Sequence, residues 1–206
     1  MVPSTPAVPE LDHRARLLEA MAVAVTEKGY AQTTIADVAR CARVSKRTFY
    51  EHFADKEECF LAAYAALSDL AFERIASAAR QQSAPEARLD AALRAYIAVL
   101  EEQPAMTRSF LMEIQAAGPK ALLLRRAILG RYSDLLRMLV DAAHAGHPEV
   151  APLSPDMATA LVGGINELLL LTLEQGHTRF GEVGAIARRL IRAVALPDRP
   201  GNSATS

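Results

Sequence analysis

Apolar residues recur every three to four positions along most of the chain, and no stretch keeps the two-residue alternation of a half-buried strand. This pattern predicts an all-α protein. Glycine and proline signals divide it into nine helices. Two short helices are expected within residues 33–53, and the other seven span about residues 11–28, 56–81, 83–103, 106–116, 120–145, 155–175 and 181–196.

The two short helices carry the most specific pattern in the chain. Asp37 follows Thr34 by three residues, the spacing of a capping box, so Thr34 is the expected N-cap of the first helix. Ser45 is the natural N-cap of the second helix, which is expected to bury Phe49 and Phe53. Its polar side chains are left on exposed or partly exposed positions: Lys46, Arg47, Thr48, Tyr50 and His52. This arrangement predicts a helix-turn-helix whose second helix enters the major groove of DNA.

Several short motifs around these helices form a recognisable series. They are Gly29-Tyr30, Thr33-Thr34-Ile35, Ile35-Ala36-Asp37-Val38-Ala39, Val44-Ser45, Thr48-Phe49-Tyr50-Glu51-His52-Phe53 and Asp55-Lys56-Glu57-Glu58. In identity and order they resemble the N-terminal domain of TetR-family transcriptional regulators. The resemblance runs from about Leu11 to Tyr64, whereas the rest of the chain is only generically similar.

The resemblance implies an organisation for the whole chain. Residues 11–64 would be a three-helix DNA-binding domain, with the helix-turn-helix at about 33–53. Residues 65–196 would form a larger helical domain for effector binding and dimerisation. Proline punctuation predicts a disordered lead-in at 1–10, and a polar, disordered tail is expected at 197–206.

The resemblance also assigns roles at the DNA. Lys46 and Arg47 would read bases, since their donors suit guanine O6 and N7. Phosphates would be held by Thr34, Ser45, Thr48, Tyr50, His52 and Lys56.

Arg43 departs from the family, which usually has glycine before Val44. If its φ is positive, arginine costs about 1 kcal/mol relative to glycine. Alternatively the turn is rearranged and Arg43 gains a phosphate contact. Both interpretations stay open at this point.

The C-terminal helices suggest two further surfaces. Residues 155–175 are apolar almost all round and contain Gly163-Gly164, so a subunit interface is favoured over a monomeric bundle. The expected interface residues are Leu161, Gly164, Ile165, Leu168, Ile186, Leu190 and Val194. An apolar effector pocket, implied by the family, is expected near polar or aromatic residues in apolar helices: Tyr96, Phe110, Glu113, Tyr132 and Asn166. For each of these residues singly, a surface, interface or core position is the competing interpretation.

Composition narrows the chemistry. The 206 residues are 51% hydrophobic with a net charge of −1, so any positive potential that attracts DNA must be local.

Cys41 and Cys59 are expected to be small buried hydrophobes. His144 and His147 lack a third ligand, so no metal and no cofactor are predicted. The run Leu168–Leu173 is too short to cross a bilayer, and a cytoplasmic protein without membrane contact is expected.

The sequence thus predicts a homodimeric, cytoplasmic transcriptional repressor. It would bind a palindromic operator in double-stranded DNA and be released by a small, largely apolar effector. Two alternatives compete with this prediction: a helical ligand-binding or catalytic protein with a structural helix-turn-helix, and a non-specific nucleoid protein. No catalytic motif is present, so we expect no enzyme. Near-neutral charge argues against the nucleoid protein.

Overall fold

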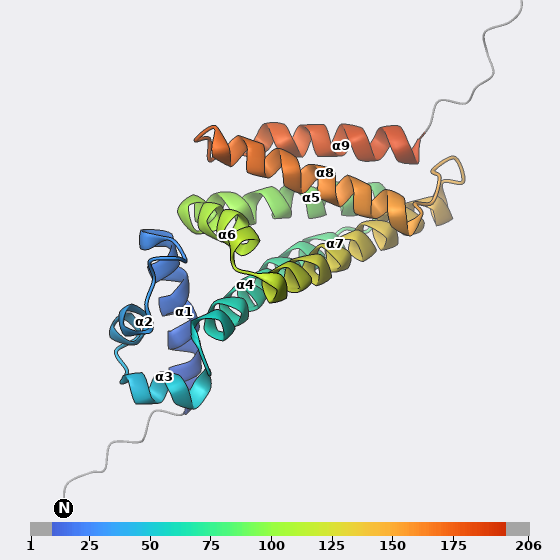
Figure 1. Ribbon diagram of the computed structural model, residues 1–206. Coiled ribbons are helices and arrows are strands. Elements are labelled where there is room, and N and C mark those ends of the chain that lie inside the picture. The colour runs from blue at the N-terminus through green and yellow to red at the C-terminus, as the bar shows by residue number, and fades with distance from the viewer. Residues whose placement is uncertain (1–9, 197–206) are drawn as a thin grey trace, which may run out of the picture. The chain divides into compact units, whose positions relative to one another are not determined.

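The computed structural model describes residues 10–196, and within them every element is a helix (Figure 1). The nine helices are α1 (Glu10–Lys28), α2 (Ile35–Ala42), α3 (Lys46–His52), α4 (Lys56–Arg80), α5 (Pro85–Glu102), α6 (Pro104–Ala116), α7 (Pro119–Gly146), α8 (Pro155–Glu174) and α9 (Gly181–Ala195). The predicted all-α class and order of helices are confirmed. The segments predicted to be disordered lie outside the described residues, except Glu10, which begins α1.

The described chain divides into two compact units. One contains the residues up to Ser68 together with Ala105–Leu124, and the other contains Asp69–Pro104 and the residues from Arg125 onward. The predicted domain boundary at Tyr64 therefore differs from the boundaries of these two units. Most of α6 joins the N-terminal unit because Phe110 stacks on Phe60, with ring centroids 5.5 Å apart and planes inclined by 5°.

The core of the N-terminal unit is built by α1–α3, α6 and the first part of α4. Helix α1 packs on both α2 and α3. Helix α1 ends where predicted because Gly29 adopts φ +77°, a left-handed conformation that favours glycine. A Cβ atom at Gly29 would also lie 3.1 Å from the Oε1 atom of Glu113 on α6. The largest side chains in this core are fully buried: Leu17, Met21, Val25, Val38, Phe49, Phe60 and Ile114.

In the second unit, α9 packs against α8 and α5 (Figure 1). Its core includes Leu169, Leu173, Phe180 and Ile191, all essentially inaccessible to solvent. Helix α8 is long and apolar enough to cross a bilayer by length and composition alone. That signal is weak, because the core helix of a soluble protein passes the same test, and α8 buries seven of its residues within this unit.

Two local features of α4 and α5 stand out. Leu70 on α4 is 59% exposed. The N-cap of α5 is Ala84, which offers no side-chain hydrogen bond. Pro85 at the first helical position supplies the start signal instead, because its fixed φ suits a first turn and its missing N–H costs nothing there.

Candidate functional site

The start of α2 is held by the predicted capping box. The Thr34 hydroxyl accepts from the Asp37 N–H at 3.2 Å, and the Thr34 N–H donates to the Asp37 carboxylate at 3.1 Å. Lys28 and Arg40 also donate to this carboxylate, at 2.7 and 3.1 Å. Hydrogen bonds from Lys28, then from Thr34 and Arg40, hold the pKa of Asp37 well below its usual range.

The turn between α2 and α3 depends on Arg43. Its φ of 55° and ψ of 45° place it in the left-handed region, the single non-glycine residue there among the described residues. This decides the question left open by the sequence: the turn keeps the geometry that favours glycine. The Nη2 atom of Arg16 donates to the Arg43 carbonyl at 3.1 Å and also to the Ala42 carbonyl. Sequence reasoning missed Arg16, since its partners lie 26 and 27 residues away.

Helix α3 is anchored by its apolar side and its N-cap. The Ser45 hydroxyl accepts from the Thr48 N–H at 3.0 Å, as predicted. Phe49 and Phe53 are 0% and 3% exposed, and the Arg14 guanidinium lies 5.4 Å from the Phe53 ring centroid. Because α3 is fixed by these aromatic rings, its opposite side is held in a constant orientation.

The polar side of α3 faces solvent. Lys46, Arg47 and Tyr50 are exposed, whereas Thr48 and His52 are half-buried. The Arg47 Nε atom donates to Glu51 at 3.2 Å, one helical turn away. An exposed pair of this kind contributes only about 0.3–0.5 kcal/mol, so a nucleic-acid partner can displace it at little cost.

Lys56 is the first residue of α4, and its side chain contacts the segment between α1 and α2. Its ammonium donates to the Tyr30 carbonyl at 2.9 Å and lies 4.3 Å from the Tyr30 ring centroid. Burial, followed by the charges of Glu57 and Asp55, raises the pKa of Tyr30. Lys56 therefore ties α4 to the α1–α2 connection, a structural role that its predicted phosphate contact did not include.

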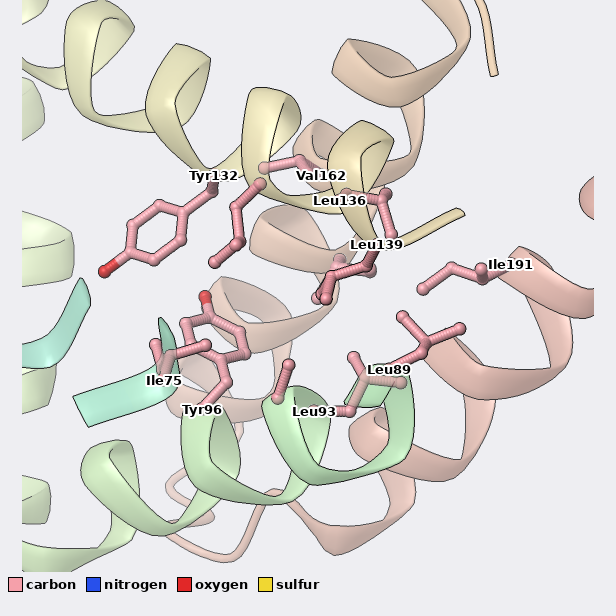
Figure 2. Close-up of a pocket in the computed structure, with 12 residues that line it drawn as sticks. Ile75, Leu89, Leu93, Tyr96, Tyr132, Leu136, Leu139, Val162 and Ile191 are labelled. Atoms are coloured by element: carbon pink, nitrogen blue, oxygen red, sulfur yellow. The ribbon is translucent and has the colours of Figure 1, made fainter. Parts of the chain in front are cut away.

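An apolar cavity lies within the second unit, with a volume of about 70 Å³. Figure 2 shows Ile75, Tyr96 and Tyr132 at one end of its lining and Leu89, Leu139 and Ile191 at the other. Five helices contribute: Ile75 from α4, Leu89, Ala92, Leu93 and Tyr96 from α5, Tyr132, Leu135, Leu136 and Leu139 from α7, Val162 and Ile165 from α8, and Ile191 from α9.

The predicted effector residues do not gather in one place. Tyr96 and Tyr132 line the cavity, with ring centroids 5.8 Å apart. Phe110 and Glu113 were misplaced, because α6 packs in the N-terminal unit against Phe60 and Gly29. Asn166 is 4% exposed and accepts a hydrogen bond from Arg125 at 2.6 Å, outside the lining.

The predicted interface residues fall into two groups, one buried within the subunit and one accessible to a partner. Leu161 and Ile165 are 7% and 6% exposed within their own subunit, so they present almost no surface to a partner. Their assignment to an interface is corrected: they belong to the subunit core, and Ile165 lines the cavity. The remaining members are exposed or half-buried: Gly164, Leu168, Ile186, Leu190 and Val194.

The two cysteines differ in burial. Cys59 is fully buried, and burial raises the pKa of its thiol to about 12. Cys41 is exposed on α2, so the expectation that it is buried was wrong. His144 donates to the Val150 carbonyl at 2.6 Å, and the described side chains contain no group of three potential metal ligands.

The fold and the capped helix-turn-helix define a DNA-binding regulatory protein of the all-α type. Residues 17–63 match the family model of bacterial regulatory proteins, tetR family. These residues therefore form a DNA-binding domain of the tetR type, and the chain is a DNA-binding transcriptional regulator. No curated protein sequence matches it.

Solved structures share the fold over nearly the whole chain. The fatty acid degradation regulator FadR from Bacillus halodurans is 16% identical, with a TM-score of 0.73, covering 96% of this chain and 99% of that one. FadR from Bacillus subtilis, in complex with stearoyl-CoA, is 15% identical with a TM-score of 0.72 over 88% and 97%. A regulator from Saccharomonospora viridis, in complex with choline, is 18% identical with a TM-score of 0.71 over 88% and 96%.

Proposed function

We propose that the protein is a homodimeric repressor that binds a palindromic operator through α3 and releases it when an apolar effector enters the cavity of the second unit. The observation that carries the DNA-binding role is the exposed polar side of α3, held by buried Phe49 and Phe53. Lys46 and Arg47 lie in its first turn, the part of a recognition helix that meets base edges. The protein acts in the cytoplasm and has no catalytic role.

The DNA contacts follow from exposure and position. Lys46 and Arg47 read bases, while the surrounding hydroxyl and imidazole groups hold phosphates. Because Arg43 is exposed in the turn before α3, its guanidinium adds a further phosphate contact. The phosphate contacts are Thr34, Arg43, Ser45, Thr48, Tyr50, His52 and Lys56.

A second copy of this chain is the proposed partner of α8 and α9. Apolar or small residues recur on α8 at spacings of three or four positions, from Met157 through Gly164 to Leu171, with Met157 and Leu171 more than 40% exposed. On α9, Leu190 is 41% exposed beside half-buried Ile186. Pairing these stripes in a two-fold dimer would bury them and place two α3 helices in successive major grooves.

The cavity supports the effector part of the proposal. Apart from the hydroxyls of Tyr96 and Tyr132, its lining side chains are aliphatic. Its volume of about 70 Å³ is below the roughly 300–1,000 Å³ of ordinary ligand pockets, so an effector must separate the helices to enter. Because the helices must separate, binding of the effector in the cavity changes the arrangement of the helices within the subunit. Release of DNA requires the effector to favour the incompetent state by about 5 kcal/mol.

The proposal is tested by fluorescence anisotropy with a labelled duplex. The duplex carries an inverted repeat from the DNA upstream of the protein's own coding region, where a self-regulating repressor would bind. A scrambled duplex is the control, and both are measured at two salt concentrations. We expect tight, specific binding that weakens on addition of decanoate, 1-decanol or stearoyl-CoA. Equal affinity for both duplexes would contradict the operator-binding role.

A further inference from the structure

The side chain of Arg125 on α7 has a neutral amide as its hydrogen-bond partner. It is half-buried, and its Nη2 atom donates to the Oδ1 atom of Asn166, itself 4% exposed, at 2.6 Å. Among the carboxylate side chains that the structure describes, none forms an ion pair with Arg125. In the same unit Arg74 and Arg131 each pair with one. A half-buried guanidinium with a neutral amide as its partner is a ready site for an anion.

The side chain of Arg125 lies on the same side of α7 as the cavity-lining Tyr132. Arg125 precedes Tyr132 by seven residues, which is two helical turns, so both side chains project from the same face of α7. On α8, Asn166 directly follows Ile165, which lines the cavity. Figure 2 places Tyr132 at the opposite end of the lining from Leu139 and Ile191. Since α7 runs from Arg125 through Tyr132 to Leu139, the charge lies beyond the tyrosine end.

The polarity therefore changes in order along the pocket. Aliphatic side chains occupy the end near Leu139 and Ile191, and the hydroxyls of Tyr96 and Tyr132 belong to the other end of the lining. Arg125 lies outside the lining, two helical turns before Tyr132 on α7. A carboxylate in an apolar environment is very unfavourable unless it is paired and hydrogen-bonded. Arg125 offers several donors to a carboxylate, and the amide of Asn166 can supply one more.

We propose that the effector is an apolar molecule with one carboxylate, whose chain occupies the cavity while its carboxylate displaces the Asn166 carbonyl from Arg125. This inference rests on the proposed effector pocket and adds the chemical class of its ligand. It separates the roles of the two ends: the aliphatic end sets the tolerated length of the chain, and Arg125 selects the acid over neutral compounds of the same shape.

The test compares decanoate with 1-decanol by isothermal titration calorimetry on the full-length protein. We expect the wild type to bind the acid about 10- to 100-fold more tightly than the alcohol, the range for a hydrogen bond to a charged group. Arg125→Gln should remove this preference and leave alcohol binding unchanged, whereas Arg125→Lys should restore part of it. Arg126→Gln is the matched control, because Arg126 is the exposed neighbour on the same helix and its loss should have no effect.

Each outcome decides the proposal. Equal binding of acid and alcohol by the wild type, or an unchanged preference in Arg125→Gln, would overturn the carboxylate assignment while the apolar pocket stands. Failure of both compounds to bind would overturn the pocket as well, with operator binding still separately testable. If Arg125→Gln proves unstable by circular dichroism, Asn166→Ala provides the second variant. It removes one donor to the carboxylate but keeps the guanidinium, so the preference for acid should be reduced without being abolished, and complete loss of that preference would also contradict the proposal.

Discussion

The guanidinium of Arg16 on α1 donates a hydrogen bond to the backbone carbonyl of Arg43 at 3.1 Å, which ties α1 to the turn before α3. The last carbonyls of a helix have no partner within it, and Arg16 supplies one at the end of α2. The turn thus keeps its left-handed residue although that residue is arginine.

Arg43→Gly should stabilise the protein by about 1 kcal/mol, because glycine adopts the left-handed conformation without the steric cost of a Cβ atom. Urea unfolding measures the change. Arg43→Ala is the matched control, since it keeps the Cβ atom and should show no gain. Both variants should lose the proposed phosphate contact and weaken operator and random DNA alike.

Lys46→Ala and Arg47→Ala should each cost about 1–3 kcal/mol on the preferred operator and relax base preference. Lys56→Ala should instead weaken binding to all sequences alike and flatten the salt dependence, in addition to losing its bond to the Tyr30 carbonyl. Anisotropy with cognate and random duplexes distinguishes the two patterns. Equal losses on both duplexes for all three variants would contradict the assignment.

Acidification should selectively remove a stabilising contribution from Asp37. Its pKa is depressed in the folded protein relative to its ordinary value of 3.8, so the unfolded chain binds the proton more readily. The contribution is therefore complete above that value and is lost as the pH falls toward the folded pKa. Urea unfolding at a series of pH values should show wild type more stable than Asp37→Asn at neutral pH, with the two converging in acid. A constant difference at every pH would refute this.

Leu190→Glu should dissociate the proposed dimer and leave the subunit folded, because Leu190 is 41% exposed in the subunit. At an interface the new carboxylate would be buried without a partner, at a cost of several kcal/mol. Leu70→Glu is the control, since Leu70 is also exposed but lies on α4. Light scattering should give one subunit mass for the first variant and two for the second. A wild-type mass of one subunit would end the dimer proposal.

Local features could be predicted from the sequence because their causes lie within a few residues. The caps at Thr34 and Ser45 depend on a side chain and a backbone N–H three residues away, and both formed as expected. Gly29 ends α1 for an equally local reason. The burial of Phe49 and Phe53 follows from their spacing on a short helix that has one apolar side. The class of fold and the exposed polar side of α3 were therefore determined by the sequence alone.

Positions that depend on which helices meet were decided only by the tertiary structure. The pattern of α8 is apolar nearly all round, so it could not show that Leu161 and Ile165 face their own subunit. Likewise, nothing near Phe110 indicated that its ring would stack on Phe60, 50 residues earlier, rather than line the cavity. The pairing of Arg125 with Asn166 joins residues 41 positions apart. Helical periodicity identifies an apolar face, but packing between distant segments selects the partner that covers it.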